Sequence, residues 1–152
     1  MIKKLTAKTE NDMRLLGERL AELVRGGEFI ALFGGLGAGK TTLVRYFASS
    51  LGADAAASPT FTIVRSYTEG RVPILHFDCY RLADADELFA IGFDDYLASN
   101  SVILMEWSKN VLDALPDERL EIRLEGSGSD PREVTLSSYG VTYDELLGGL
   151  EL

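Results

Sequence analysis

Hydrophobic positions near the start of the chain follow first a helical and then a continuous pattern. Within residues 9–25 the apolar side chains that recur on one helical face are Met13, Leu16, Leu20, Leu23 and Val24. Thr9 precedes them and can act as the N-cap, while glycines at 26–27 favour an end to the helix. Residues 28–33 are short and mostly apolar, which is typical of a strand covered on both faces. The chain is therefore predicted to run from an amphipathic helix into a buried strand.

Helical and strand patterns alternate along the rest of the chain. Glycine-rich residues 34–39 lead into a second helical pattern that ends at Gly52, and strands at 61–68 and 72–77 flank a turn signal at 69–71. The later elements are two helical pieces within 83–98 that break near Gly92, a strand at 101–106, a helical turn at 108–115 and a hairpin of 120–124 with 133–136. This interleaving predicts the α/β class, with a mixed, partly parallel sheet flanked by helices and extended by antiparallel hairpins.

The composition is that of a folded domain. The 152 residues, 46% hydrophobic and 26% charged, suffice for one core, and no linker or repeat divides them, so residues 1–152 are expected to form a single domain. The lone Cys79 excludes an internal disulfide, and no leader pattern is visible, so a cytoplasmic setting is expected. Apolar runs such as 29–33 are far shorter than the roughly 20 residues of a membrane span, so no membrane partner is expected.

The charge balance argues against direct binding of nucleic acid. Lys and Arg number 15 against 24 Asp and Glu, which gives a formal net charge of −9. Neutralising a phosphate backbone requires a field of basic side chains, which this balance does not favour. Any role with nucleic acid is therefore expected to be shared with a partner.

A phosphate-binding loop is the strongest chemical signal in the sequence. Residues 34–41 read Gly-Gly-Leu-Gly-Ala-Gly-Lys-Thr, the GxxxxGK[ST] spacing, between a predicted buried strand and a predicted helix. Glycines let backbone N–H groups converge on phosphate oxygens, Lys40 would reach the β- and γ-phosphates, and Thr41 would give its hydroxyl to Mg²⁺. The candidate nucleotide-binding residues of the loop are Gly35, Leu36, Gly37, Ala38, Gly39, Lys40, Thr41 and Thr42.

The expected nucleotide is ATP. A GTPase normally carries an N/T-K-x-D segment for guanine, and the nearest sequence, Ser-Lys-Asn-Val at 108–111, lacks the aspartate. Residues 78–81, Asp-Cys-Tyr-Arg, also lack the glycine of a D-x-x-G switch. ATP with Mg²⁺ is therefore favoured over GTP.

Carboxylates end two of the predicted strands. Asp78 follows residues 74–77, Ile-Leu-His-Phe, and Glu106 follows the apolar residues 102–105. A strand ending in an acid can hold Mg²⁺ or orient the attacking water, at the edge where an α/β sheet forms its ligand crevice. The plainer interpretation of each acid is a turn or a helix cap.

A possible γ-phosphate sensor and three packing residues complete the candidates. Thr60 and Thr62 occupy the stretch where P-loop NTPases often place a switch loop, although a Ser-Pro-Thr turn entering a strand would look the same. His76 is expected to be a core or edge histidine rather than a catalytic base, Trp107 to pack rather than to stack on the nucleotide, and Cys79 to fill a small buried space.

In order and spacing, four segments resemble the bacterial TsaE family, the small P-loop ATPases of tRNA threonylcarbamoyladenosine biosynthesis. They are GGLGAGKTT at 34–42, SPTFT at 58–62, HFDCYRL at 76–82 and Glu-Trp at 106–107. The resemblance implies a P-loop NTPase-like fold. It extends from the predicted helix that contains residues 16–20 to about residue 125 and is weakest toward the C-terminus. Three positions depart from the family's pattern: Gly35 stands where Asp is usual, Cys79 replaces a commonly aliphatic residue, and Ser108 follows Trp107 where many relatives have Pro.

The resemblance also implies a function and partners. The chain would hydrolyse ATP to reset or regulate a complex of the TsaB and TsaD proteins, which modify the adenosine next to the anticodon, and would meet tRNA only through that complex. The implied roles are phosphate contact for Lys40, Mg²⁺ binding for Thr41 and Glu106, the hydrolytic water network for Asp78, a mobile switch loop for Thr60, and the border of the nucleotide for Glu10 and Arg132.

Two other functions stay open on the sequence alone. The first is a small-molecule kinase on the same loop, although such kinases usually need an arginine-bearing lid and no Arg-rich insertion is visible. The second is a non-enzymatic module that binds ATP and only changes shape.

Overall fold

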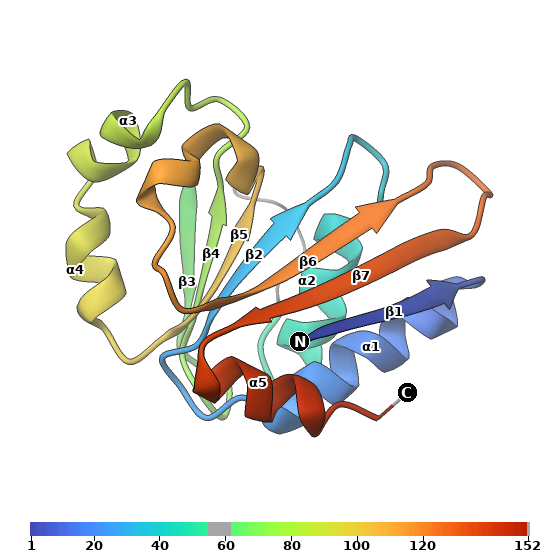
Figure 1. The fold of residues 1–152 in the computed structure, drawn as a ribbon. Helices are drawn as coiled ribbons and strands as arrows, with labels where there is room; N and C mark the ends of the chain where they lie inside the picture. Colours follow the sequence, from blue (N-terminus) through green and yellow to red (C-terminus); the bar gives the residue numbers. More distant parts are fainter. Residues whose placement is uncertain (55–61, 152) are drawn as a thin grey trace.

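A mixed β-sheet forms the centre of the molecule (Figure 1). The computed structural model describes residues 1–54 and 62–151, and within them the strands are β1 Ile2–Ala7, β2 Phe29–Phe33, β3 Val64–Tyr67, β4 Ile74–Asp78, β5 Val102–Glu106, β6 Arg119–Glu125 and β7 Arg132–Tyr139. They lie in the order β1-β7-β6-β2-β5-β4-β3. The central strands β6, β2, β5 and β4 run parallel, whereas β3, β7 and β1 pair antiparallel with their neighbours. The predicted mixed, partly parallel sheet is confirmed.

Helices cover both faces of this sheet. They are α1 Glu10–Leu23, α2 Lys40–Ser50 and α5 Val141–Gly148 on one face, and α3 Ala85–Ala90, α4 Phe93–Ala98 and the 3-10 helix η1 Ser108–Ala114 on the other. In the described part of the chain no helix is both long and apolar enough to cross a bilayer.

Strand β2 shows how the sequence builds two cores. All five of its side chains are buried, as the apolar run at 28–33 predicted. Ile30 and Leu32 pack into the cluster beneath α1 and α2, while Phe29, Ala31 and Phe33 pack into the cluster beneath α3, α4 and η1. Because successive side chains of a strand point to opposite faces, one apolar run supplies both layers.

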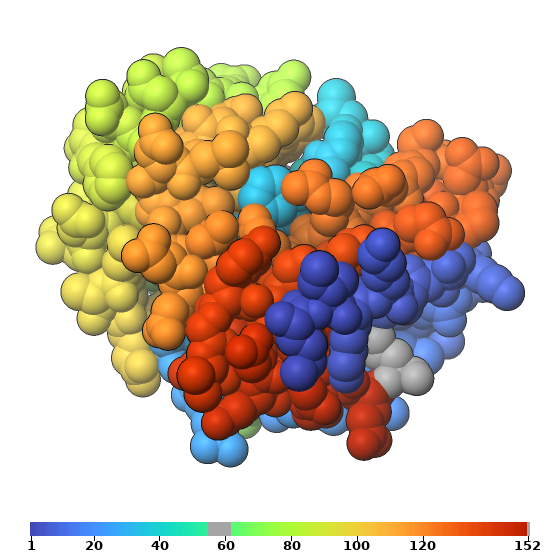
Figure 2. All heavy atoms as spheres, in the orientation of Figure 1, coloured from blue at the N-terminus to red at the C-terminus, as the bar shows by residue number. Residues whose placement is uncertain are grey.

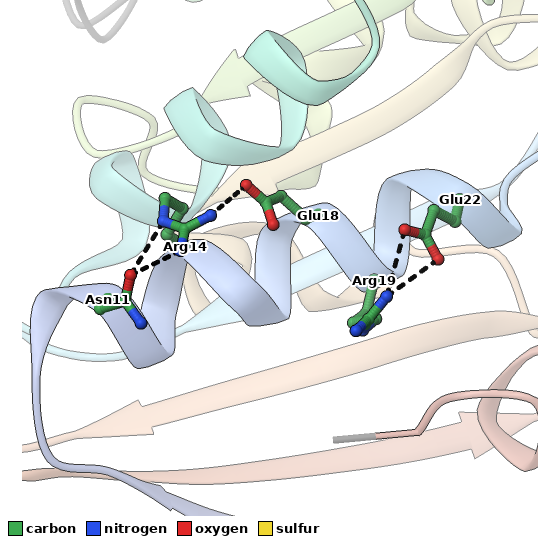
Figure 3. A network of polar contacts seen from close by, with 5 residues as sticks. All are labelled: Asn11, Arg14, Glu18, Arg19 and Glu22. Carbon is green, nitrogen blue, oxygen red and sulfur yellow. Dashed lines mark hydrogen bonds and ion pairs between the residues drawn. The ribbon is translucent and has the colours of Figure 1, made fainter.

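Helix α1 begins as the sequence predicts. The Thr9 hydroxyl accepts from the Asp12 N–H at 3.3 Å, and the Asp12 carboxylate accepts from the Thr9 N–H at 3.1 Å. This reciprocal capping box satisfies N–H groups that would otherwise lack partners at the helix start. Figure 3 shows polar contacts along the helix, which join Arg14 to Asn11 and Glu18, and Arg19 to Glu22.

Helices α1 and α2 approach each other closely at Gly17. A Cβ at this position would lie 2.9 Å from the Phe47 backbone nitrogen and 2.9 Å from the Tyr46 Cβ, which is too close for any side chain. Glycine therefore lets α1 lie against the backbone of α2. Because α2 follows the glycine-rich loop directly, this contact also fixes where the loop ends.

Several predicted elements have shifted ends. The β3–β4 hairpin and the two helical pieces, which break at Gly92 with φ +86°, match the prediction. Strand β3 begins at Val64 rather than at 61, since Ile63 has a left-handed φ of +67° that a strand cannot continue through; residue 61 lies outside the described residues. Strands β6 and β7 extend further than the predicted 120–124 and 133–136.

Two elements, β1 and α5, were missing from the sequence interpretation. Strand β1 lies at the sheet edge against β7, and of its residues only Ala7 is fully buried, so its apolar pattern is weak. Helix α5 buries Tyr143, Leu146 and Leu147, a helical spacing that is present in the sequence. The edge strand is hard to detect from sequence, whereas the helix was detectable.

Candidate functional site

A cavity of about 400 Å³ lies at the carboxyl ends of β2, β4 and β5. Its lining consists of loop residues 35–42 together with Asp78, Tyr80, Glu106, Trp107 and Arg132. The carboxyl ends of parallel strands share one edge of a sheet, and the positive end of α2 faces the same edge. The predicted phosphate loop and both predicted acids therefore meet in one place.

The loop backbone has the conformation that its glycines allow. Gly34 has φ +153°, and a Cβ there would lie 2.7 Å from the Leu124 carbonyl oxygen. Gly39, the residue before α2, has φ +106°. At Gly35, by contrast, a Cβ would meet nothing within 4 Å, and its φ is not among the positive ones. The turn thus requires glycine at Gly34 and Gly39 and does not require it at Gly35.

The Lys40 ammonium is turned back onto the loop. Its Nζ donates to the carbonyl of Gly34 and, at 2.9 Å, to that of Gly35, and it lies 4.1 Å from the centre of the Trp107 ring. Burial lowers the pKa of Lys40 below its usual value, while the carboxylates of Glu106 and Asp78 act in the opposite direction. Lys40 is therefore held inside the cavity by neutral carbonyl and aromatic contacts.

Asp78 and Glu106 are neighbours across two parallel strands. The register of β4 and β5 pairs them, and they are 4% and 3% exposed. The Thr41 hydroxyl donates to Glu106 Oε1 at 2.9 Å, which links β5 to the first turn of α2. Asp78 Oδ1 accepts from the Tyr80 N–H at 2.9 Å, so Asp78 also has the turn role that was its plainer interpretation. Glu106 has no such role, because it precedes η1 and contacts Thr41 and His76 instead.

Thr41 and Glu106 together suit Mg²⁺. The pair Oγ1 and Oε1 consists of hard oxygens, and Mg²⁺ usually takes one or two protein groups plus phosphates and waters rather than a cage of side chains. Among the described residues, no group of three or more His, Cys, Asp or Glu is placed to hold a metal. The residues present thus fit a metal that is shared with a phosphorylated ligand.

A second cavity, of about 330 Å³, adjoins the first and shares Gly39, Thr42 and Arg132 with it. Glu10, at the start of α1, lines this second cavity. The Arg132 guanidinium donates to the Ala38 carbonyl at 3.1 Å and to the Gly37 carbonyl at 3.0 Å, which joins β7 to the loop. The two residues expected to border the nucleotide therefore lie on one cavity beside the loop.

The remaining predicted residues have varied outcomes. Thr60 lies outside the described residues. Cys79 is buried, as expected, and burial raises the pKa of its thiol to about 12. Trp107 does pack, with its ring 4.9 Å from that of Tyr80, but it packs as a wall of the cavity.

Sequence reasoning missed Tyr80 as part of the cavity and His76 as a partner of Glu106. His76 Nε2 lies 2.6 Å from Glu106 Oε2. The available signal was the spacing of His76 and Asp78, since residues two apart on a strand share a face.

A groove of about 710 Å³ lies between the start of the loop, η1 and the end of β6. In Figure 2 the cyan loop is visible in a recess between the orange η1 segment and the orange β6–β7 hairpin. Two apolar side chains of this groove are largely exposed, Leu36 at 73% and Leu112 at 56%. Two exposed leucines thus border the loop, in a groove that also contains the charged residues Lys109, Glu121, Arg123 and Glu125.

Comparison with known proteins identifies the family. A family model described as "Threonylcarbamoyl adenosine biosynthesis protein TsaE" matches residues 7–134. The chain belongs to the TsaE family. A TsaE protein of Bacillus subtilis is 37% identical over 148 residues, covering 95% of this chain and 92% of the relative. A TsaE protein of Streptomyces coelicolor is 42% identical over 137 residues, covering 84% of this chain and 91% of the relative.

A solved structure agrees with this TsaE assignment. The crystal structure of Bacillus subtilis YdiB matches with a TM-score of 0.82 at 33% identity, and the match covers 99% of this chain and 95% of that one. The family resemblance inferred from the four sequence segments and the P-loop NTPase-like fold that it implied are both confirmed.

Proposed function

We propose that this chain is a Mg²⁺-dependent ATPase that serves threonylcarbamoyladenosine modification of tRNA. The observation that carries the proposal is a single cavity to which α2 contributes Lys40 and Thr41, and β4 and β5 contribute Asp78 and Glu106. Transfer of a phosphoryl group to water uses a cation on the phosphates, metal ligands and a carboxylate that orients the water. The process is taken from the names of the curated relatives, tRNA threonylcarbamoyladenosine biosynthesis protein TsaE.

In this proposal the triphosphate occupies the cavity of about 400 Å³ and the adenosine extends into the adjoining one of about 330 Å³. The shared residues Gly39, Thr42 and Arg132 lie where the two cavities meet, so one extended ligand can follow the loop through both. Glu10 and Arg132 would then border the nucleoside. Both are polar side chains, which suits contact with ribose hydroxyls and phosphate oxygens.

The chemistry divides among the residues of the first cavity. Lys40 would leave the Gly34 and Gly35 carbonyls for the β- and γ-phosphates, and Thr41 and Glu106 would hold Mg²⁺. Bound Mg²⁺ would neutralise charge on the phosphate oxygens. Asp78, fixed by the Tyr80 N–H, would accept a hydrogen bond from the attacking water. This contact would direct a lone pair of the water oxygen at the γ-phosphorus.

The partners would be the TsaB and TsaD proteins, in the cytoplasm, and the chain would meet tRNA only as part of their complex. Leu36 and Leu112 are exposed beside the loop, so a partner protein bound there would cover both side chains close to the nucleotide. Such a contact would let ATP turnover and the state of the complex influence each other.

The test is phosphate release from ATP by the purified chain, alone and with TsaB and TsaD, in single-turnover and multiple-turnover conditions. The expected result is slow hydrolysis by the chain alone and clear stimulation by the pair. Binding of ATP without phosphate release under any of these conditions would favour the sensing module. Consumption of ATP only when a metabolite is added would favour the kinase.

A further inference from the structure

Hydrogen bonds engage both oxygens of the Glu106 carboxylate. Oε1 accepts from the Thr41 hydroxyl at 2.9 Å, and Oε2 lies 2.6 Å from His76 Nε2. Glu106 is 3% exposed and His76 1% exposed, so water has little access to compete for these contacts. The orientation of the carboxylate is therefore set by α2 on one side and by β4 on the other.

His76 reaches Glu106 from behind the cavity. On β4 the side chains of Ile74, His76 and Asp78 share the face that α1 and α2 cover. The register pairs His76 with Leu104, two positions before the pair formed by Asp78 and Glu106. His76 is not among the described residues that line the cavity, so it supports the carboxylate without contacting the space for the ligand.

The second ring nitrogen indicates what His76 can do. His76 Nδ1 is buried and has no hydrogen-bond partner within the described chain. In the tautomer with the hydrogen on Nδ1, that buried N–H would have nothing in the described chain to accept it, which costs more than leaving a lone pair unused. The hydrogen therefore belongs on Nε2, and because an ionised carboxylate only accepts, Nε2 donates to Oε2. The ring therefore acts toward Glu106 as a hydrogen-bond donor.

From this geometry we infer that His76 is a positioning residue for the magnesium site, a role that rests on the proposed function. By holding Oε2 of Glu106, it directs Oε1 toward the Thr41 hydroxyl and toward the metal that these two oxygens would share. Groups that hydrogen-bond to metal-ligating carboxylates typically raise metal affinity 10- to 100-fold, about the effect expected here.

The test compares three variants by ADP binding during a Mg²⁺ titration, with ADP binding in EDTA measured separately by calorimetry. His76→Leu removes the donor at similar volume. His76→Gln keeps an N–H donor that can reach the same oxygen. Ile74→Ala is the matched control, because Ile74 is a buried residue on the same strand and face and is not among the partners of Glu106.

In His76→Leu we expect the half-maximal increase in ADP binding to require about 10- to 100-fold more Mg²⁺ than in the wild type. The affinity for ADP in EDTA stays unchanged. His76→Gln restores most of this loss, and Ile74→Ala leaves the Mg²⁺ dependence in place. If His76→Leu kept the wild-type Mg²⁺ dependence, the proposed function would stand but this inference would be overturned. An equal effect in Ile74→Ala, or an equal loss in EDTA, would also overturn it, in favour of a purely structural histidine. A wild-type chain whose ADP binding does not respond to Mg²⁺ would overturn the proposed function and this inference with it.

Discussion

Lys40 is subject to opposing influences within one cavity. Burial disfavours its charge, two carboxylates favour it, and the Gly34 and Gly35 carbonyls and the Trp107 ring hold the ammonium in place. Neutral carbonyls are weaker partners for a cation than ionised phosphate oxygens. The contacts therefore hold the Lys40 side chain inside the site, and in the proposed function it would exchange these carbonyls for phosphate oxygens.

We expect Lys40→Ala to weaken ATP binding and to lower phosphate release by about 100-fold or more, because a single preorganised donor at the transition state has that effect. Binding is measured by calorimetry and turnover by phosphate release. Lys109→Ala is the matched control, since Lys109 is exposed and lies 5.2 Å from the same Trp107 ring. Unchanged phosphate release in Lys40→Ala would remove the loop from the mechanism.

Asp78 allows chemistry to be separated from binding. Asp78→Asn keeps an oxygen that can accept from the Tyr80 N–H, so the turn survives, but it removes the charge that would act on the water. We expect turnover to fall by about 100-fold with little change in ADP affinity. Equal losses in turnover and affinity, or a change only in melting temperature, would leave Asp78 with the turn role alone.

At the scale of elements, the sequence predicted the layers of the fold better than the contacts inside the site. Helix α1 has a clear helical periodicity and strand β2 a continuous apolar run, and both were found near their true ends. The approach of His76 to Glu106 depends on the register of β4 against β5, which no local pattern encodes. The order of the strands, with β6 parallel to β2, also depends on long-range pairing rather than on local sequence.

Gly17 makes a prediction about the two helices that support the loop. Alanine in a helix interior is favoured over glycine by about 0.5–1 kcal/mol, but overpacking a tight contact costs about 1–3 kcal/mol. Since a Cβ at Gly17 would lie 2.9 Å from α2, we expect Gly17→Ala to lower the free energy of unfolding by about 1–2 kcal/mol, as measured by urea denaturation.

Gly148→Ala is the control for Gly17→Ala. It places the same methyl group in a helix where the nearest atom, the Met1 Cε, lies 3.9 Å away. We expect this variant to be as stable as the wild type or slightly more stable, because only the gain in helix propensity remains. Equal stability of the two variants would show that α1 and α2 can separate without cost.

At the scale of the whole molecule, charge decides which partner the chain can meet directly. The net charge is −9, and Arg14 and Arg19 of α1 are paired with Glu18 and Glu22 (Figure 3). The starts of α3 and α4 add acidic residues: Asp84, Asp86, Glu87, Asp94 and Asp95. These paired and acidic surfaces do not form the basic field that a phosphate backbone requires.

We therefore expect no appreciable tRNA binding by the isolated chain near physiological salt, although the proposed process acts on tRNA. The measurement is a tRNA titration at two salt concentrations, with the TsaB and TsaD pair plus this chain as the positive control. A chain that neutralised phosphates would bind tightly at low salt and lose affinity steeply as salt rises, since released counterions set that slope. Tight, salt-sensitive binding by the chain alone would mean that its basic side chains gather into a tRNA-binding surface despite the net charge. Absence of binding, together with binding by the complex, would place tRNA recognition on the partners and leave this chain to act on the complex through ATP.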